Sequence, residues 1–518
     1  MTSTFHSVET AKRSLFTQTA ALNTTGHNIA NANTAGYTRQ RVNMVASKPI
    51  EAYGMTHSTV PGQLGTGVEF QSVERIRESF LDEQYRNENK ALGNWNIQYD
   101  TLDKLQTIIN EPSDTGISSL INNFYKSWSD LSKDPENVTN RKIVKETTLA
   151  LTDALNHTSK QLSDLNSDLT NSVELNAGKL NSMLSSISEL NNQITRIESS
   201  GSDNANDLRD QRDLLVDQLS SLVNVKVTEM PDGYQVAMGS QILVEGSTTN
   251  PVSSETLQQA YGSGDLNSGE VYGTFVSRDR YVADYQKQLD QFADTLVNGD
   301  IQITIPAGSV LPEGTILDGK TYAGAGRTLS SDLTVTVKGI NGLHKLGYSL
   351  NDGKPVAGGD FFSAKGDGPI TASNITLSQA IVDNPSLIAS SMRTMGSDPN
   401  EQVVKGNNGL AILMSNLKDT KFDFGGGLTA PTTVDDYFKA IVGQVGVQAN
   451  EAKRQADNAL VLTTQVDQKR QSVSGVSLDE EMSNMIMFQH AYSAAARVMT
   501  TFDEMLDKLI NGTGVVGR

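Results

Sequence analysis

The end of the chain holds the sequence that decides the fold, and residues 477–510 read SLDEEMSNMIMFQHAYSAAARVMTTFDEMLDKLI. Apolar side chains recur there every three or four residues, at Met485, Phe488, Tyr492, Ala495, Met499, Phe502, Leu506 and Leu509. This spacing is typical of the apolar seam of a coiled coil. Ser477 and Glu480 stand at the spacing of a capping box, in which each side chain binds a free backbone amide of the other residue. We therefore expect a long helix that begins just after Ser477 and packs against another helix.

The first 30 residues show a related pattern. Val8, Leu15, Leu22 and Ile29 recur every seven positions, which predicts an amphipathic helix that ends near Asn31. Two helices with apolar seams thus stand at opposite ends of the sequence, and neither has an obvious partner nearby. We expect them to pair with each other or with neighbouring subunits. An ordinary buried-core role for both stripes is the alternative reading.

The sequence between these ends predicts several domains, because 518 residues exceed what one core usually serves. Helical spacing marks residues 79–110, 138–198, 207–222, 271–298, 409–416 and 434–473, and a helix over 138–198 would be about 90 Å long. Residues 37–73 indicate extended chain with short strands. Residues 223–269 and 299–400 are rich in Gly, Thr and Val, and the turn pairs Asp232-Gly233, Asp318-Gly319 and Asp352-Gly353 predict hairpins there.

We therefore expect a mainly α fold with β-rich insertions. It would have a terminal coiled-coil domain of residues 1–50 and 474–518, which we expect to be mobile in the monomer. A long-helix rod domain with short strands would comprise residues 51–225, 270–299 and 405–473. Residues 226–269 and 300–404 would form outer β-rich regions, with 300–339 as a small outward insertion.

Composition excludes several classes of function. The net charge is −18 without a dense block of Lys and Arg, which disfavours binding to nucleic acid. The absence of Cys excludes thiol catalysis, disulfides and zinc-thiolate sites. No two of the six His stand at metal-ligand spacing and no nucleophile motif occurs, so we expect no metal, no cofactor and no enzyme activity. No apolar stretch approaches the length of a membrane span, and the opening residues lack the apolar core of a secretory signal.

A resemblance to a known family enters at residues 21–42, ALNTTGHNIANANTAGYTRQRV. They resemble the amino-terminal signature of bacterial flagellar rod, hook and hook-associated proteins, with the kernel Asn28-Ile29-Ala30-Asn31 followed by Thr34, Gly36 and Tyr37. The segments 475–482 (GVSLDEEM), 488–498 (FQHAYSAAARV) and 503–507 (DEMLD) resemble more closely the hook-associated protein 1 family, the first junction between hook and filament. Hook and rod proteins have a related but different ending.

The resemblance implies a structural adaptor that leaves the cell unfolded through the flagellar type III apparatus, without cleavage, and works outside it at the hook–filament junction. Its terminal helices would stack into a tube. The implied partners are the hook protein, the second junction protein (hook-associated protein 3), further copies of the chain and an export chaperone, with no nucleic acid and no membrane. The expected assembly residues are Val8, Leu15, Leu22, Asn28, Ile29, Asn31, Met485, Phe488, Tyr492, Met499, Phe502, Leu506 and Leu509. Those expected to bind the chaperone are Phe488, Tyr492, Phe502 and Leu506.

Two alternatives remain. The chain could be another axial subunit, a hook or rod protein, and the region around Phe488-Gln489 is the feature against this. It could also be an axial protein whose insertion at residues 300–339 carries an enzyme. The insertion contains no His or Cys, and its acids are Asp300, Glu313, Asp318 and Asp332, spread through turns.

Overall fold

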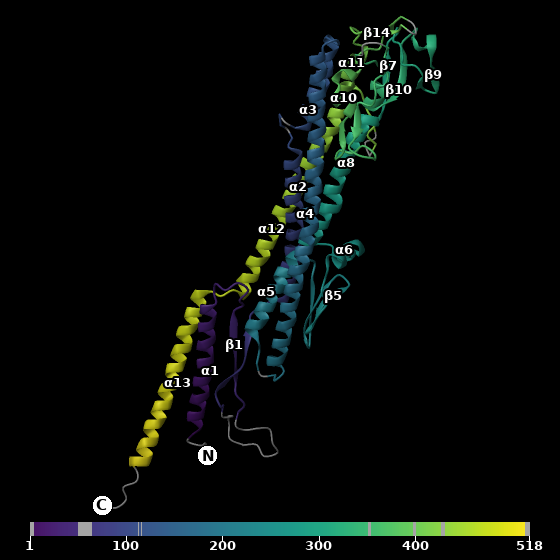
Figure 1. Ribbon diagram of the computed structural model, residues 1–518. Helices are drawn as coiled ribbons and strands as arrows, with labels where there is room; N and C mark the ends of the chain where they lie inside the picture. The colour runs from purple at the N-terminus through teal and green to yellow at the C-terminus, as the bar shows by residue number, and fades with distance from the viewer. Residues whose placement is uncertain are drawn as a thin grey trace, which may run out of the picture. The chain divides into compact units, whose positions relative to one another are not determined.

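A computed structural model describes residues 5–49, 65–111, 113–114, 116–201, 203–350, 354–396, 400–425 and 430–512. The chain folds into two compact units (Figure 1). Unit 1 comprises residues 1–95, 173–273 and 455–518, and unit 2 comprises residues 96–172 and 274–454. The long helices α2 (Ser79–Ile109), α4 (Val138–Glu198) and α12 (Val434–Ser474) each contribute to both units. With 61 residues, α4 is about 90 Å long, as its sequence predicts.

Unit 1 is built around the two ends of the chain. Helix α1 (His6–Ala30) and helix α13 (Leu478–Gly512) lie side by side and antiparallel, which confirms the expected pairing of the terminal helices (Figure 1). Helix α1 also packs on the antiparallel hairpin of β1 (Gln40–Ala46) and β2 (Val68–Arg75). Its residues in these contacts are small, with Ala11, Thr17, Ala21 and Thr25 buried. Small side chains allow the helix to approach both neighbours closely.

The rest of unit 1 combines a helix pair with a small sheet. Its elements are α5 (Asn206–Leu222), β3 (Lys226–Met230), β4 (Gly233–Met238), β5 (Gln241–Glu245), β6 (Thr248–Thr249), α6 (Ser254–Ser263) and the start of α7 (Glu270–Val276). The four strands form one antiparallel sheet in chain order. Leu190 and Ile194 of α4 pack with Ala205, and Leu208 of α5 covers this cluster. The Arg212 guanidinium stacks on the Tyr234 ring at 3.4 Å and so ties α5 to the sheet.

Unit 2 combines helices with two-stranded antiparallel sheets. Its further helices are α3 (Ile117–Lys133), α8 (Ala283–Asn298), α9 (Gly339–His344), α10 (Gln379–Asp383) and α11 (Gly409–Asn416). Its sheets pair β7 (Asp300–Ile305) with β10 (Leu333–Lys338), β8 (Thr315–Leu317) with β9 (Lys320–Tyr322), β11 (Phe362–Ala364) with β12 (Ile375–Leu377), and β13 (Thr394–Met395) with β14 (Gln402–Val403). Phe124 and Trp128 of α3 pack against Phe361 and Phe362 in the core of the unit.

Two buried polar side chains hold the irregular segment 388–390 of unit 2. Arg141 is fully buried and donates hydrogen bonds to Ser390 Oγ, to the Pro135 carbonyl and to the Ile388 carbonyl. His344 is also fully buried, with Nδ1 2.7 Å from the Gly359 carbonyl and Nε2 accepting from the Ala389 amide at 2.9 Å. Burial lowers the pKa of His344 to about 4, so the ring is neutral at pH 7.

The structure confirms most helices expected from the sequence and adds others. Helices α3 and α6 are new, and so are the short helices α9 and α10 within the region expected to be β-rich. The helix expected over residues 271–298 contains a π-helical turn at Ser277–Val282. Asp318 and Gly319 have φ of 48° and 76° between β8 and β9, as a tight two-residue hairpin turn requires. The expected turn at Asp352-Gly353 lies outside the described residues. Across the described part of the chain, no helix is both long and apolar enough to span a membrane.

Candidate assembly site

The site begins at Asn28, whose side chain makes four hydrogen bonds in the last turn of α1 and is 1% exposed. Its Oδ1 accepts from the Tyr37 hydroxyl at 2.8 Å and from the Gln40 amide at 3.0 Å. Its Nδ2 donates to the Gln40 carbonyl and to Glu481 Oε2, both at 2.9 Å. Because these bonds use the full capacity of the amide, Asn28 fixes the returning chain and the first turn of α13 at once.

Arg39 completes this connection between the two ends of the chain. Its Nε lies 2.8 Å from Glu481 Oε1 and its Nη1 lies 2.7 Å from Glu480 Oε2. The Glu481 side chain is 3% exposed, so its charge depends on Arg39 and Asn28 for stabilisation. The Arg39 amide also donates to the Ser474 carbonyl at 2.8 Å. We call Asn28, Tyr37, Arg39, Gln40 and Glu481 the polar node.

The node corrects the expected capping box. Ser477 Oγ accepts from the Glu480 amide at 3.5 Å, which is the first half of the box. The Glu480 carboxylate does not complete it, because it pairs with Arg39 from the other end of the sequence. An ion pair with a guanidinium is stronger than a bond to a neutral amide, so the long-range partner prevails.

The turn after α1 explains the spacing of the motif quoted from residues 28–37. Asn31 Nδ2 donates to the His27 carbonyl at 3.1 Å, and the Thr34 hydroxyl donates to Asn31 Oδ1 at 3.2 Å. Gly36 has φ of +79°, and a Cβ there would lie 2.9 Å from Leu214 Cβ. Only glycine meets both conditions without strain. The turn therefore delivers Tyr37 to Asn28 at a fixed position.

Tyr37 remains a hydrogen-bond donor at all ordinary pH values. Burial raises the pKa of its hydroxyl well above the usual value, and the carboxylates of Asp207, Asp210 and Glu481 raise it further. The ring also packs edge-on against His27, with 5.5 Å between centroids. The neutral hydroxyl is the form that the bond to Asn28 Oδ1 needs.

Helix α5 presents four carboxylates at helical spacing, Asp207, Asp210, Asp213 and Asp217, which we call the acidic stripe. Each contacts a segment that leads to or from a terminal helix. Asp207 accepts from the Gln40 side chain at 2.8 Å, and Asp210 accepts from the Thr38 amide at 2.8 Å. The stripe therefore anchors the chain that follows α1.

Arginines from three other segments neutralise the acidic stripe. Arg75 Nη1 lies 2.7 Å from Asp210 and 2.9 Å from Asp213. Arg86 pairs with Asp217 at 2.7 Å, and Arg470, at the end of α12, pairs with the same carboxylate. Ion pairs thus connect α5 to β2, to α2 and to the end of α12, just before α13.

Asp213 is the most strongly stabilised carboxylate of the stripe. Burial by itself would raise its pKa, but the nearby Arg77, Arg75 and Arg86 guanidiniums outweigh burial and lower the pKa to about 2. Burial dominates at Asp210 and raises its pKa despite the bond from Arg75. The difference follows from the number of cations, because Asp213 lies within 4 Å of all three arginines.

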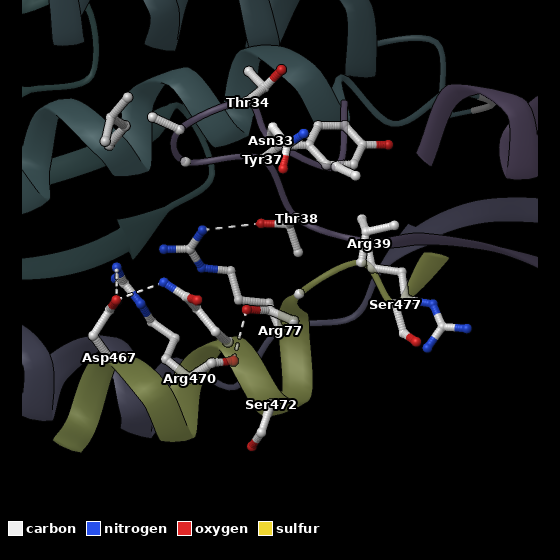
Figure 2. A pocket seen from close by; sticks show the side chains of 18 of the residues that line it. Asn33, Thr34, Tyr37, Thr38, Arg39, Arg77, Asp467, Arg470, Ser472 and Ser477 are labelled. Carbon is white, nitrogen blue, oxygen red and sulfur yellow. Dashed lines mark hydrogen bonds and ion pairs between the residues drawn. The ribbon is translucent and has the colours of Figure 1, made fainter. Parts of the chain in front are cut away.

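A polar cavity of about 530 Å³ lies beside the node, between the turn after α1 and the link from α12 to α13 (Figure 2). Arg77 Nη1 donates to the Thr38 hydroxyl at its wall at 3.2 Å, and Arg470 lies 3.0 Å from Asp467 (Figure 2). Arg77 also makes two hydrogen bonds to Asp82. The cations that line the cavity are therefore already paired with acids. Within the described ranges, no three His, Asp or Glu side chains converge as a metal site would require.

The expected assembly residues lie on the two terminal helices and in the turn after α1, and they differ in how deeply they are buried. Asn28 is buried, and half-buried positions are Val8, Leu15, Leu22, Ile29, Asn31, Met485, Phe488, Met499, Phe502 and Leu506. This partial burial fits side chains along the α1–α13 seam. Tyr492 is 40% exposed and Leu509 is 60% exposed, so these two lie towards the surface of the helix pair.

Sequence reasoning missed the acidic stripe and the arginines that pair with it. The signal was present, because Asp207, Asp210, Asp213 and Asp217 follow one another at intervals of three and four. Such a stripe usually lies on a solvated face, and only the fold shows that arginines cover it. The link between Arg39 and Glu481 has no local signal, because 442 positions separate the two residues.

Three segments of the chain match models of known protein families. Residues 102–299 match the family model for the flagellar hook-associated protein FlgK helical domain. Residues 9–38 match that for flagella basal body rod protein, and residues 467–512 match that for flagellar basal body rod FlgEFG protein C-terminal. The first of these two segments contains Asn28 and Tyr37 of the polar node, and the second contains Glu481.

The chain is 36% identical to flagellar hook-associated protein 1 of Bacillus subtilis (strain 168), with both chains covered over 100% of their length. It is 25% identical to flagellar hook-associated protein 1 of Escherichia coli (strain K12), over 95% of this chain and 97% of that one. The flagellar hook junction protein FlgK from Burkholderia pseudomallei has a similar fold, with a TM-score of 0.52 at 15% identity, over 76% of this chain and 100% of that chain. Because the identity to the Bacillus subtilis protein extends over the whole of both chains, the chain belongs to the flagellar hook-associated protein 1 family.

Proposed function

We propose that this protein is a structural adaptor that joins the flagellar hook to the filament. The observation that carries the proposal is the polar node, which locks the two ends of the chain into one antiparallel helix pair. The pair leaves large apolar side chains in water: Leu478, Met482, Ile486, Met487, Val498 and Met505 of α13 are 44% to 58% exposed. A soluble monomer rarely exposes such a surface without a partner for it. Further subunits would provide that partner.

The name of the relatives favours the junction over another axial position. Models of rod proteins match both terminal segments, so these segments alone do not distinguish hook, rod and junction subunits. The helical-domain match over residues 102–299 and the full-length relative favour the hook-associated family.

An enzymatic role for the insertion has little support from its geometry. Asp300 pairs with Lys338 at 2.7 Å, and Asp332 accepts from the Ala307 amide at 2.8 Å. Glu313 lies 3.4 Å from Arg327, and Asp318 forms the turn between β8 and β9. Asp300, Glu313 and Asp332 thus have structural partners, and the four carboxylates belong to separate segments. We keep a structural adaptor as the proposal.

In the assembled junction, the terminal helices would form the inner layer and the β-rich regions would face outwards. The division into domains of residues 1–50 with 474–518, the long-helix regions, and the β-rich regions 226–269 and 300–404 is part of this proposal. The neighbours along the axis would be the hook protein and hook-associated protein 3. The chain would reach this place outside the cell by type III export.

Before assembly, α13 would bind an export chaperone through its apolar seam. An amphipathic helix that lies in a groove of its partner is the expected mode of binding. Phe488, Tyr492, Phe502 and Leu506 would contribute the apolar contacts. Removal of residues after Val476 should abolish copurification with the chaperone, and unchanged copurification would contradict this assignment.

The adaptor proposal is tested with Phe488→Asp and Leu506→Asp in cells that lack the native gene. Both side chains are half-buried on α13, so a charge there should prevent the helix from packing. We expect no filaments on the hooks, although the circular dichroism of the purified variants shows that the middle of the chain remains folded. Gln489→Asp is the matched control, because Gln489 is exposed on the same helix. Normal filaments with both Asp variants would contradict the proposal.

A further inference from the structure

Helix α13 is rich in methionine. Of the 14 methionines of the chain, five lie in its 35 residues, at Met482, Met485, Met487, Met499 and Met505. The chain has no cysteine, so methionine thioethers are its only sulfur atoms. Methionine differs from the other apolar residues in one respect, because oxidants convert its thioether to a polar sulfoxide. The composition of α13 therefore makes its apolar surface sensitive to oxidation.

Three of these side chains are open to solvent, and we call Met482, Met487 and Met505 the methionine set. They are 58%, 55% and 46% exposed, whereas Met485 and Met499 are half-buried. An oxidant in solution can reach the methionine set while the two terminal helices remain paired. The set is therefore the part of α13 that reacts first.

The methionine set lies within the apolar surface of the helix. Leu478 and Ile486, which are 48% and 54% exposed, lie one turn to either side of Met482. Met487 and Met505 are 18 positions apart, which is five helical turns, so they share another side of α13. Oxidation would thus place polar groups on two sides of the surface that the proposed function assigns to further subunits.

The rest of the chain supplies natural controls. Met395 on β13 is 56% exposed, nearly the same as Met487, but it belongs to unit 2. Met238, Met392 and Met414 are at most 1% exposed. Oxidation should therefore affect Met395 as readily as the methionine set and should spare the buried residues.

Hydrogen peroxide oxidises a thioether by transfer of one oxygen. The sulfur lone pair attacks a peroxide oxygen, so that an S–O bond forms and the O–O bond breaks. The proton of the transferred hydroxyl passes to the departing hydroxide, which leaves as water. Sulfur is oxidised by two electrons and the peroxide is reduced. Methionine fills irregular apolar contacts, but the sulfoxide is polar, and its burial there without a hydrogen-bond donor costs free energy.

The proposed function exposes the methionine set to oxidants for a limited time. A subunit that has left the cell is in an oxidising compartment, and its α13 is uncovered until it joins the junction. We propose that Met482, Met487 and Met505 form an oxidation site, and that their conversion to sulfoxides by a peroxide prevents a free subunit from joining the hook. This inference rests on the proposed adaptor function and adds a chemical control to it.

Partial oxidation of the purified native chain tests the site without any substitution. The chain is treated with hydrogen peroxide and added to cells that have hooks but lack this gene. Peptide mass spectrometry then measures the sulfoxide at each methionine in the hook-bound and unbound fractions. We expect sulfoxide at the methionine set to be about tenfold rarer in the bound fraction, which corresponds to about 1.4 kcal/mol of lost binding free energy.

Met395 is the internal control of this experiment, and its sulfoxide should be equally frequent in both fractions. Equal frequencies at Met482, Met487 and Met505 as well would overturn the proposal. A loss at Met395 as large as that at the methionine set would mean that oxidation damages the chain in general, which also overturns it.

A variant that cannot form the sulfoxides gives a second measurement. The triple substitution Met482→Leu, Met487→Leu and Met505→Leu keeps apolar side chains of similar volume. It should keep its binding to hooks after a peroxide treatment that reduces binding of the native chain about tenfold, whereas Met395→Leu should lose binding as the native chain does. Equal loss in the triple variant and the native chain would contradict the site. If the triple variant does not bind even before treatment, the fractions of the native chain decide.

The untreated and repaired native chains separate the possible causes. If the untreated chain does not bind to hooks, the adaptor proposal fails, and the oxidation site fails with it. If it binds equally well before and after oxidation of the methionine set, only the oxidation site is wrong. Methionine sulfoxide reductases for both sulfoxide epimers, with a thiol reductant, should restore binding of the oxidised chain. Failure of this repair to restore binding would assign the loss to other damage and contradict the proposal.

Discussion

Replacing Asn28 by alanine is expected to release the helix pair from the rest of unit 1. The change removes four hydrogen bonds and leaves the Gln40 amide and carbonyl, the Tyr37 hydroxyl and one oxygen of Glu481 without their partner. Three of these bonds join neutral groups, at about 1 kcal/mol each, and the bond to the carboxylate contributes about 2 kcal/mol. Water will replace part of this sum in the variant. A net loss of about 3 kcal/mol, or roughly a hundredfold in the local opening equilibrium, remains.

Hydrogen exchange measured by mass spectrometry on the purified monomer tests this value. In the native chain, mobility of the terminal helices should decrease from their free ends towards the node. In Asn28→Ala, the amides at the end of α1 and the start of α13 should exchange about a hundredfold faster. Asn23→Ala is the matched control, because Asn23 is exposed on the same helix. Equal exchange in the two variants would refute the reasoning that Asn28 holds the two ends together.

Three further predictions concern single side chains. Burial lowers the pKa of His344 from 6.5 to about 4, so between these pH values the unfolded chain binds a proton that the folded chain does not. The free energy of unfolding of unit 2 should therefore fall by about 3 kcal/mol as the pH falls from about 6.5 to 4. Urea unfolding at a series of pH values should show this loss in the native chain and not in His344→Gln. The same pH dependence of the free energy of unfolding in both chains would contradict the prediction. Asp213, with its pKa lowered to about 2, contributes stability above pH 4 that should disappear between about pH 4 and 2, by about 2 kcal/mol. Acid unfolding of unit 1 in Asp213→Asn should lack this step. Gly36→Ala should lower the stability of unit 1 by about 2 kcal/mol, because Gly36 has a left-handed φ and an added Cβ would press on Leu214. Gly26→Ala is the control, because an added Cβ there meets nothing within 4 Å, and calorimetry should show a lower unfolding temperature only for Gly36→Ala.

Periodicity made the helices predictable, because apolar side chains at intervals of three and four report directly on burial. The expected range 138–198 agrees with α4 (Val138–Glu198). Helix α3 was not predicted, although Ile117, Ile121, Phe124 and Trp128 have the same spacing. Its sequence signal was sufficient, and its amphipathic side faces the core of unit 2.

The site was predictable only in part. The motif at Asn28 could be recognised, but its physical role could not, because its partner Glu481 lies 453 positions away. The local sequence predicted a capping box for Glu480, but its carboxylate pairs with Arg39 from the other end of the chain instead. Polar networks of this kind depend on tertiary structure, which brings charges together from segments that have no common period.

Electron microscopy of cells that lack this gene, with the medium assayed for flagellin, tests the central claim most directly. The adaptor account predicts hooks without filaments and unassembled flagellin in the medium. The native gene should correct both defects, and the Phe488→Asp gene should correct neither. Missing hooks would assign the chain to the rod or hook instead. Normal filaments in the cells that lack the gene would contradict the account.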